Sequence, residues 1–225
     1  MKYVLPLAFA LCFCADAGTV LFSDFGLSDS FSTAGGSVLQ GSNGNTRQSI
    51  TQAREFTVSG SGDFDVTEIR LAVFVNAGAS SFAAGIFTNN GALPGTQIGA
   101  NYNLTSNTAC GPSCYSVVDQ TGVTGITLTG GTLYWMVLRP QSLTDSSTNL
   151  WRDNNQGSTS LVVASLDGGS HWITENGAQT NAAFAVLGDA ATVAAPEPGE
   201  LILLASGLLA VIGAATRRRR RVSAL

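Results

Sequence analysis

The chain has 225 residues, of which only 12% are charged, 44% are hydrophobic and 26 are glycine. This composition argues against a helical bundle and against a highly charged disordered chain, and the length suits one domain of ordinary size. Residues 18–195 contain five arginines, no lysine and twelve acidic residues, a net charge of −7 that repels phosphate backbones and excludes nucleic-acid binding.

The N-terminal residues have the pattern of a secretory signal. Lys2 is followed by eleven mostly apolar residues, Val4 to Cys14, and then by Ala15-Asp16-Ala17. Small residues at the −3 and −1 positions predict a signal peptide over residues 1–17, cleaved after Ala17. A lipoprotein signal is the alternative, but large side chains precede both cysteines of the apolar run.

Short apolar stretches separated by Gly, Ser, Asn and Asp follow from Thr19, and no helical periodicity is sustained. The stretches that suit strands are Arg54–Val58, Val66–Val75, Ala83–Phe87, Gly125–Leu128, Thr132–Leu138, Leu161–Val163 and Ala182–Val186. Many short strands with turns between them predict an all-β fold. We expect one antiparallel β-sandwich or jelly-roll-like domain over residues 18–188.

Two of these stretches allow a prediction of which side chains are buried. Within Val66–Val75, the face that carries Thr67, Ile69, Leu71, Val73 and Val75 is the better core candidate. Leu133–Leu138 is expected to bury alternate side chains.

Turn residues separate the predicted strands. The turn signals are Ser59–Gly62, Asn89–Gly91, Leu93–Gly95, Gly130-Gly131 and Asp167–Gly169. In the third, Pro94 fixes φ for the first corner of a turn and Gly95 suits the positive φ of the second.

The order of segments in the body is similar to that of choice-of-anchor type R domains, which occur in surface proteins with varied C-terminal anchors. The segments that carry the resemblance are Ala53–Val58, Gly85–Phe87, Gly91–Thr96, Leu133–Trp135 and Ala183–Val186. It spans most of Thr46 to Gly188 and implies a β-rich domain, with no activity attached to it.

Cys110 and Cys114 are the cysteines that remain after removal of the signal peptide. In an exported protein, this pair predicts one local disulfide that closes a Gly/Pro loop. A redox pair is the alternative, but thioredoxin-type motifs place two residues between their cysteines, and this loop has three.

His171 is the single histidine of the chain and lies in Ser165-Leu166-Asp167-Gly168-Gly169-Ser170-His171-Trp172. A zinc site with several histidines is therefore excluded. The octet resembles the Asp-box hairpin of sialidases and related β proteins, with His171 where Thr is usual. The resemblance implies that Asp167 and Ser165 bind backbone donors of the turn and that Trp172 packs beneath. A Ser-His-Asp hydrolase would have to use His171, yet no Gly-x-Ser-x-Gly motif occurs.

Loop oxygens make calcium the metal to consider. The candidate ligands are Asp63, Asp65, Asp153, Asn154, Asn155 and Asp167. No segment has the spacing of an EF-hand loop, and ordinary turn residues are the alternative. Asp63 and Asp65 are also the closest pair of carboxyls for glycosidase chemistry, but they lie in a Gly-rich turn, where solvated loop acids are common.

Three tryptophans, Trp135, Trp151 and Trp172, are candidates for a platform on which a sugar ring stacks. The alternative is that they fill the core of the sandwich, as large aromatic residues commonly do.

The C-terminal residues form three parts in order. Pro196-Glu197-Pro198 precedes an apolar run from Leu201 to Ala215, and the run precedes five arginines: Arg217, Arg218, Arg219, Arg220 and Arg221. The apolar run is short for a bilayer, but a helix over residues 199–216 just reaches across one. The five arginines hold their end of such a helix in the cytoplasm, which leaves the β domain on the far side of the inner membrane.

This order resembles the PEP-CTERM sorting signal of Gram-negative bacteria, from Ala195 to about Val222. The resemblance implies that an exosortase, a membrane cysteine protease, recognises Pro196, Glu197 and Pro198 and that the protein reaches the cell surface or the exopolysaccharide matrix. The two prolines make the segment around Glu197 stiff and non-helical. A plain C-terminal membrane anchor is the alternative.

We therefore expect a signal peptide (1–17), a β domain (18–188), a linker (189–195) and a sorting segment (196–225). The expected role is structural, adhesive or carbohydrate-binding in a biofilm matrix, without catalysis and without a cofactor unless calcium binds. The expected partners are the exosortase, the inner membrane in transit and surface glycans. A secreted hydrolase that acts on polysaccharide is the alternative function.

Overall fold

The computed structural model describes residues 18–106, 117–174 and 177–192. These residues form antiparallel sheets and one short 3-10 turn, η1 (Leu27–Asp29), and the described part of the chain contains no α-helix. The predicted all-β, antiparallel fold is confirmed.

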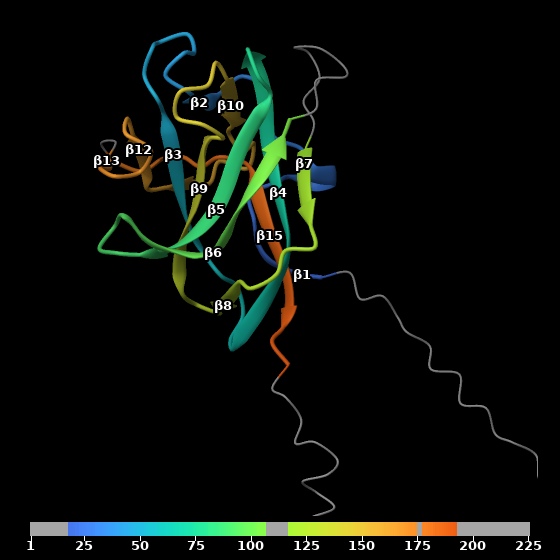
Figure 1. The fold of residues 1–225 in the computed structure, drawn as a ribbon. Coiled ribbons are helices and arrows are strands. Elements are labelled where there is room, and N and C mark those ends of the chain that lie inside the picture. Colours follow the sequence, from blue (N-terminus) through green and yellow to red (C-terminus); the bar gives the residue numbers. More distant parts are fainter. Residues whose placement is uncertain (1–17, 107–116, 175–176, 193–225) are drawn as a thin grey trace, which may run out of the picture. The chain divides into compact units, whose positions relative to one another are not determined.

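Seven strands make the first sheet (Figure 1). They are β1 (Thr19–Ser23), β15 (Phe184–Ala190), β4 (Asp63–Ala77), β10 (Thr148–Arg152), β2 (Gly36–Gln40), β7 (Val117–Thr121) and β8 (Thr127–Thr129). The long strand β4 organises the sheet, because Ile69 pairs with Val186 of β15 on one side and with Gln120 of β7 on the other. β4 continues beyond these residues to pair with β10.

Six strands make the second sheet, in the order β13-β12-β3-β9-β5-β6. They are β13 (Ile173–Thr174), β12 (Val162–Ser165), β3 (Thr51–Thr57), β9 (Leu133–Pro140), β5 (Ser81–Asn89) and β6 (Pro94–Thr105). A separate two-stranded ribbon joins β11 (Thr159–Ser160) to β14 (Gln179–Thr180).

The two sheets share one hydrophobic core. Its centre is aromatic, because Phe184 of β15 lies 5.5 Å from Trp151 of β10 and 5.6 Å from Phe56 of β3, measured between ring centroids. Aliphatic side chains from both sheets surround these rings: Leu21, Leu39, Ile69, Leu71, Val73, Ile86, Met136 and Leu138. Burial of this apolar surface is the main favourable contribution to folding.

The predicted core face of β4 is confirmed at Ile69, Leu71 and Val73, which are at most 2% exposed. Val66 belongs to the same core, although the alternation places it on the opposite face. The register explains the difference, because Leu187 pairs with Glu68 and Gly188 pairs with Val66, so Thr67 is an extra residue in a β-bulge. The bulge reverses the inward and outward positions on either side of it.

Alternate burial is wrong for β9, where every side chain from Tyr134 to Leu138 is buried. β9 lies between β3 and β5, and both of its faces are covered. Met136 and Leu138 point into the shared core, whereas Trp135 and Val137 belong to a second apolar cluster on the outer face.

The turn expected at Leu93–Gly95 is also wrong, because Pro94 begins the long strand β6. The reversal is made by Gly91 and Ala92, whose φ values are +58° and +70°, as a two-residue type I′ hairpin requires. Asn90 N–H donates to the carbonyl of Leu93 at 2.8 Å and closes this hairpin. Pro94 is tolerated because the first residue of a strand can lack an N–H group.

The β domain continues two residues beyond its predicted end. Asp189 and Ala190, expected in the linker, pair with Asp65 and Phe64 at the end of β15. The short polar and small residues there suggested a linker, whereas pairing with the long strand β4 keeps them in the sheet.

Candidate functional site

Several of the predicted functional residues lie outside the described part of the chain. They are the signal peptide, the helix expected over 199–216, Cys110 and Cys114, the sorting residues Pro196, Glu197 and Pro198, and the arginine cluster Arg217, Arg218, Arg219, Arg220 and Arg221. The expected disulfide, sorting signal and membrane topology therefore stay predictions. The described residues contain no helix long and apolar enough to cross a membrane.

Trp135 and Trp151 do not form the expected sugar platform, because both side chains are 0% exposed. Trp151 lies in the shared core, where its Nε1–H donates to the carbonyl of Ala183 at 3.3 Å. Trp135 lies in the outer cluster and donates to Asn89 Oδ1 at 3.0 Å. The alternative interpretation, that tryptophan fills the core, holds for these two residues because each apolar ring is enclosed and its N–H has a partner.

Trp172 is half-buried and follows a turn that has the predicted Asp-box contacts. Ser165 Oγ accepts hydrogen bonds from the N–H groups of Asp167 and Gly169, at 3.3 and 2.8 Å. Asp167 Oδ1 accepts from the His171 N–H at 2.9 Å. The prediction that Ser165 and Asp167 bind backbone donors is confirmed. These bonds close the turn between β12 and β13.

His171 adds a contact on the solvent side of this turn. Its Nδ1 lies 2.5 Å from Asp167 Oδ2, and its side chain is 88% exposed. The hydrogen bonds from the His171 side chain, the His171 N–H and the Ser165 hydroxyl lower the pKa of Asp167. His171 therefore supports the turn through Asp167 and has the role of a turn residue.

Trp172 packs on the second apolar cluster, which lies on the outer face of the six-stranded sheet. The cluster consists of Ala53, Trp135, Val137 and Val163, with Phe87, Leu93, Leu133, Leu161 and Trp172 half-buried around it. Glu55 pairs with Trp135 across β3 and β9, and partial burial raises the pKa of this carboxyl. Of the three tryptophans of the expected platform, Trp172 is the one that remains in contact with solvent.

The four aspartates proposed for calcium are not brought together. Two lie on β4 and not in the expected Gly-rich turn, one follows β10, and Asp167 is in the turn between β12 and β13. Asp63 and Asp65, both on β4, accept hydrogen bonds from the hydroxyls of Thr129 and Thr127 of β8, at 2.6 and 2.7 Å. Asp153 follows β10, where burial raises its pKa while Arg54 and Arg152 act in the opposite direction. Across residues 18–106, 117–174 and 177–192, no three His, Cys, Asp or Glu side chains are grouped so as to hold a metal ion.

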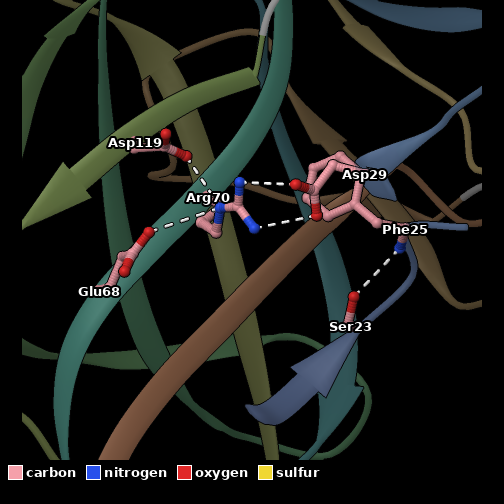
Figure 2. Close-up of polar contacts among 6 residues, drawn as sticks. All are labelled: Ser23, Phe25, Asp29, Glu68, Arg70 and Asp119. Carbon is pink, nitrogen blue, oxygen red and sulfur yellow. Dashed lines mark hydrogen bonds and ion pairs between the residues drawn. The ribbon is translucent and has the colours of Figure 1, made fainter. Parts of the chain in front are cut away.

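An arginine-centred network on β4 was missed by the sequence predictions (Figure 2). Arg70 makes a bidentate pair with Asp29 of η1, through Nη1–Oδ1 and Nη2–Oδ2 distances of 2.9 and 2.8 Å. Its Nε donates to Asp119 Oδ1 of β7 at 2.9 Å and lies 3.5 Å from Glu68 Oε1. The alternation in β4 placed Glu68 and Arg70 on one face, but no local pattern indicated Asp29 or Asp119.

A buried carboxylate, Asp24, forms a second polar cluster that the sequence did not indicate. Asp24 is 8% exposed and accepts hydrogen bonds from Ser158 Oγ at 2.7 Å and from Asn181 Nδ2. Burial raises the pKa of Asp24, and the two hydrogen bonds offset part of this effect. Asn154 Nδ2 donates to the carbonyls of Ser158 and Asn181, so the cluster joins three segments that are far apart in sequence.

The polar clusters around Arg70 and Asp24 connect loops to the sheets. The charged groups around Arg70 are partly exposed, whereas Asp24 is buried. Both clusters stabilise the arrangement of the loops that they join. Scans against family models, curated proteins and solved structures found no match to the chain.

Proposed function

We propose that the chain is an exported, non-catalytic β-sandwich protein that is sorted to the cell surface or the extracellular polysaccharide matrix by its C-terminal segment. In this proposal an exosortase recognises Pro196, Glu197 and Pro198 and releases the domain from the membrane. The observation that carries the proposal is the order of three parts in the tail. A Pro-Glu-Pro triplet is followed by an apolar run just long enough for a membrane-spanning helix, and then by five consecutive arginines.

The charge distribution supports this topology. Residues 18–195 have a net charge of −7, whereas Arg217 to Arg221 contribute five positive charges at the other side of the apolar run. Arginines of this kind remain in the cytoplasm during insertion, so an acidic domain and a basic end on opposite sides of a membrane agree with the proposed orientation. The apolar run after Lys2 has the pattern of a secretory signal, which also directs the β domain across the inner membrane.

The architecture supports a structural or adhesive role. The shared core between two antiparallel sheets, with strands from distant parts of the sequence side by side, agrees with a jelly-roll-like sandwich. Because Trp135 and Trp151 are buried, we assign glycan contact to the half-buried residues around Trp172.

The sorting proposal is tested by changing one carboxylate of the motif in the full-length protein. We expect Glu197→Gln to shift the protein from the extracellular fraction to the membrane fraction, because the recognised charge is lost. Glu200→Gln is the matched control, since it removes the same charge three residues further along. Equal secretion of both variants and the unchanged protein would count against recognition of the triplet.

A further inference from the structure

The hairpin between β5 and β6 has an asparagine followed directly by a glycine at its turn (Figure 1). Asn90 and Gly91 are both exposed, and the φ of Gly91 is +58°. A β-carbon added to Gly91 would meet no other atom within 4 Å, so this side of the turn is open to solvent. Since glycine has no β-carbon, its peptide nitrogen is the least hindered nucleophile for a preceding asparagine side chain.

The same dipeptide occurs at Asn43-Gly44, where hydrogen bonds hold both reacting groups. Gly44 N–H donates to the carbonyl of Gly41 at 2.9 Å. Asn43 Nδ2 donates to the carbonyl of Thr144 at 2.5 Å. These bonds occupy the nitrogen that would attack and the amide that would leave. The third Asn-Gly pair of the sequence begins at Asn176, which lies outside the described residues.

Neither group is held in this way at the hairpin. Among the described residues, no hydrogen bond is found from the Gly91 N–H or from the Asn90 side-chain amide. The bond that closes the hairpin uses a different group, since the Asn90 main-chain N–H donates to the Leu93 carbonyl at 2.8 Å. The Asn90 side chain therefore turns toward the Gly91 nitrogen without breaking a hydrogen bond of its own.

We propose that Asn90-Gly91 is a site of spontaneous self-modification, at which the asparagine side chain closes on the glycine nitrogen and becomes aspartate or isoaspartate. The Gly91 nitrogen bonds to Asn90 Cγ, the Cγ–Nδ2 bond breaks, and Nδ2 leaves as ammonia with the Gly91 proton. Water then opens the imide ring at either carbonyl. The reaction goes beyond the proposed sorting function and does not depend on it, because water is the only other reactant.

The product changes both the charge and the backbone length of the hairpin. Either acid adds negative charge to residues 18–195, whose net charge is already −7. Isoaspartate also adds a methylene group to the main chain between Asn89 and Gly91. Asn89 Oδ1 accepts from Trp135 Nε1 at 3.0 Å, and Leu93 packs against the outer apolar cluster. The added length therefore falls between two contacts with that cluster.

Peptide mapping of the purified full-length chain by mass spectrometry, after incubation in mildly alkaline buffer, tests the site. The rate at each asparagine is divided by its rate in guanidinium chloride, which removes the influence of neighbouring residues in the sequence. We expect this relative rate to be about tenfold higher at Asn90 than at Asn43, because two hydrogen bonds at Asn43-Gly44 must open first. An equal or lower relative rate at Asn90 would overturn the proposal.

Two glycine variants test the attacking nitrogen. We expect Gly91→Ala to lower conversion at Asn90 severalfold, because the added methyl group hinders that nitrogen. Gly122→Ala is the matched control, since Gly122 has a φ of +68° and, like Gly91, no atom within 4 Å of an added β-carbon. It is expected to leave conversion at Asn90 unchanged, and thermal denaturation confirms that both variants fold. Equal conversion at Asn90 in the two variants would contradict attack by the Gly91 nitrogen.

Discussion

Arg70 connects three segments of the chain at one guanidinium group. Asp29, Glu68 and Asp119 come from η1, β4 and β7, and each carboxylate lies within 3.5 Å of an Arg70 nitrogen. The bidentate pair with Asp29 fixes the orientation of the side chain, because a guanidinium matches a carboxylate with two parallel hydrogen bonds. The segment around η1 therefore depends on Arg70 for its attachment to β4.

We expect Arg70→Ala to lower the free energy of unfolding by about 1 kcal/mol, the upper range for partly exposed ion pairs, because three carboxylates lose their shared cation. Hydrogen exchange of residues 24–35 should increase. Urea denaturation and exchange mass spectrometry measure the two effects. Arg139→Ala removes the same charge from a half-exposed residue of β9 and is the control. Equal losses in the two variants would contradict the attachment of η1.

Asp24 makes stability depend on pH in a predictable direction. Its pKa is raised by burial, so its contribution favours folding below its ordinary pKa of about 3.9 and is lost as pH rises through the higher folded value. Asp24→Asn removes this dependence, because an amide does not ionise. We expect the stability of the variant relative to the unchanged protein to increase between pH 3 and pH 7. Denaturation curves at several pH values measure it, and a constant difference would contradict the buried charge.

The turn between β12 and β13 is an element whose local bonds can be tested one at a time. Ser165 is 0% exposed and its Oγ takes part in three hydrogen bonds within the turn. We expect Ser165→Ala to lower the free energy of unfolding by about 1–3 kcal/mol, because two partly buried N–H groups of the turn lose their acceptor. Ser170→Ala is the control, since its exposed hydroxyl donates one bond of 3.3 Å. A loss in Ser165→Ala no larger than in the control would exclude Ser165 as the centre of the turn.

The two apolar clusters predict different costs for the loss of a tryptophan. Trp151 is enclosed between the sheets, and we expect Trp151→Ala to destabilise the protein by about 3–5 kcal/mol through loss of packing. Trp172 is half-buried on the outer cluster, and its replacement by alanine should cost less. Thermal denaturation compares the two variants. The opposite order would show that Trp151 is not a core residue.

Local patterns predicted seven of the described strands (β3, β4, β5, β8, β9, β12 and β15), because apolar runs and turn residues are encoded within a few positions. Strands β1, β2, β6 and β10 were not predicted. The Asp-box turn was predictable for the same reason, since Ser165, Asp167 and Trp172 lie within eight residues. The missed features depend on contacts between distant segments. Arg70 donates to Asp29, which is 41 residues away in the sequence, and Asp24 accepts a hydrogen bond from Asn181, which is 157 residues away. The outer cluster that buries Trp135 likewise combines side chains from distant segments, among them Phe87 and Trp172.

Charge and hydropathy differ between the β domain and the C-terminal residues of the chain. The β domain is acidic, and Arg70 joins carboxylates of η1 and β7 to β4. The C-terminal residues place an apolar run between Glu200 and five arginines. The proposed function assigns this tail to transport.

Mass spectrometry of the mature protein tests this attribution most directly. We expect protein recovered from the extracellular matrix to begin at Gly18 and to lack Arg217 to Arg221, because both ends are removed during export. In cells without the exosortase, the C-terminal residues should remain and the protein should stay with the membrane. Recovery of the full-length chain from the cytosol, with its arginines intact, would contradict the account.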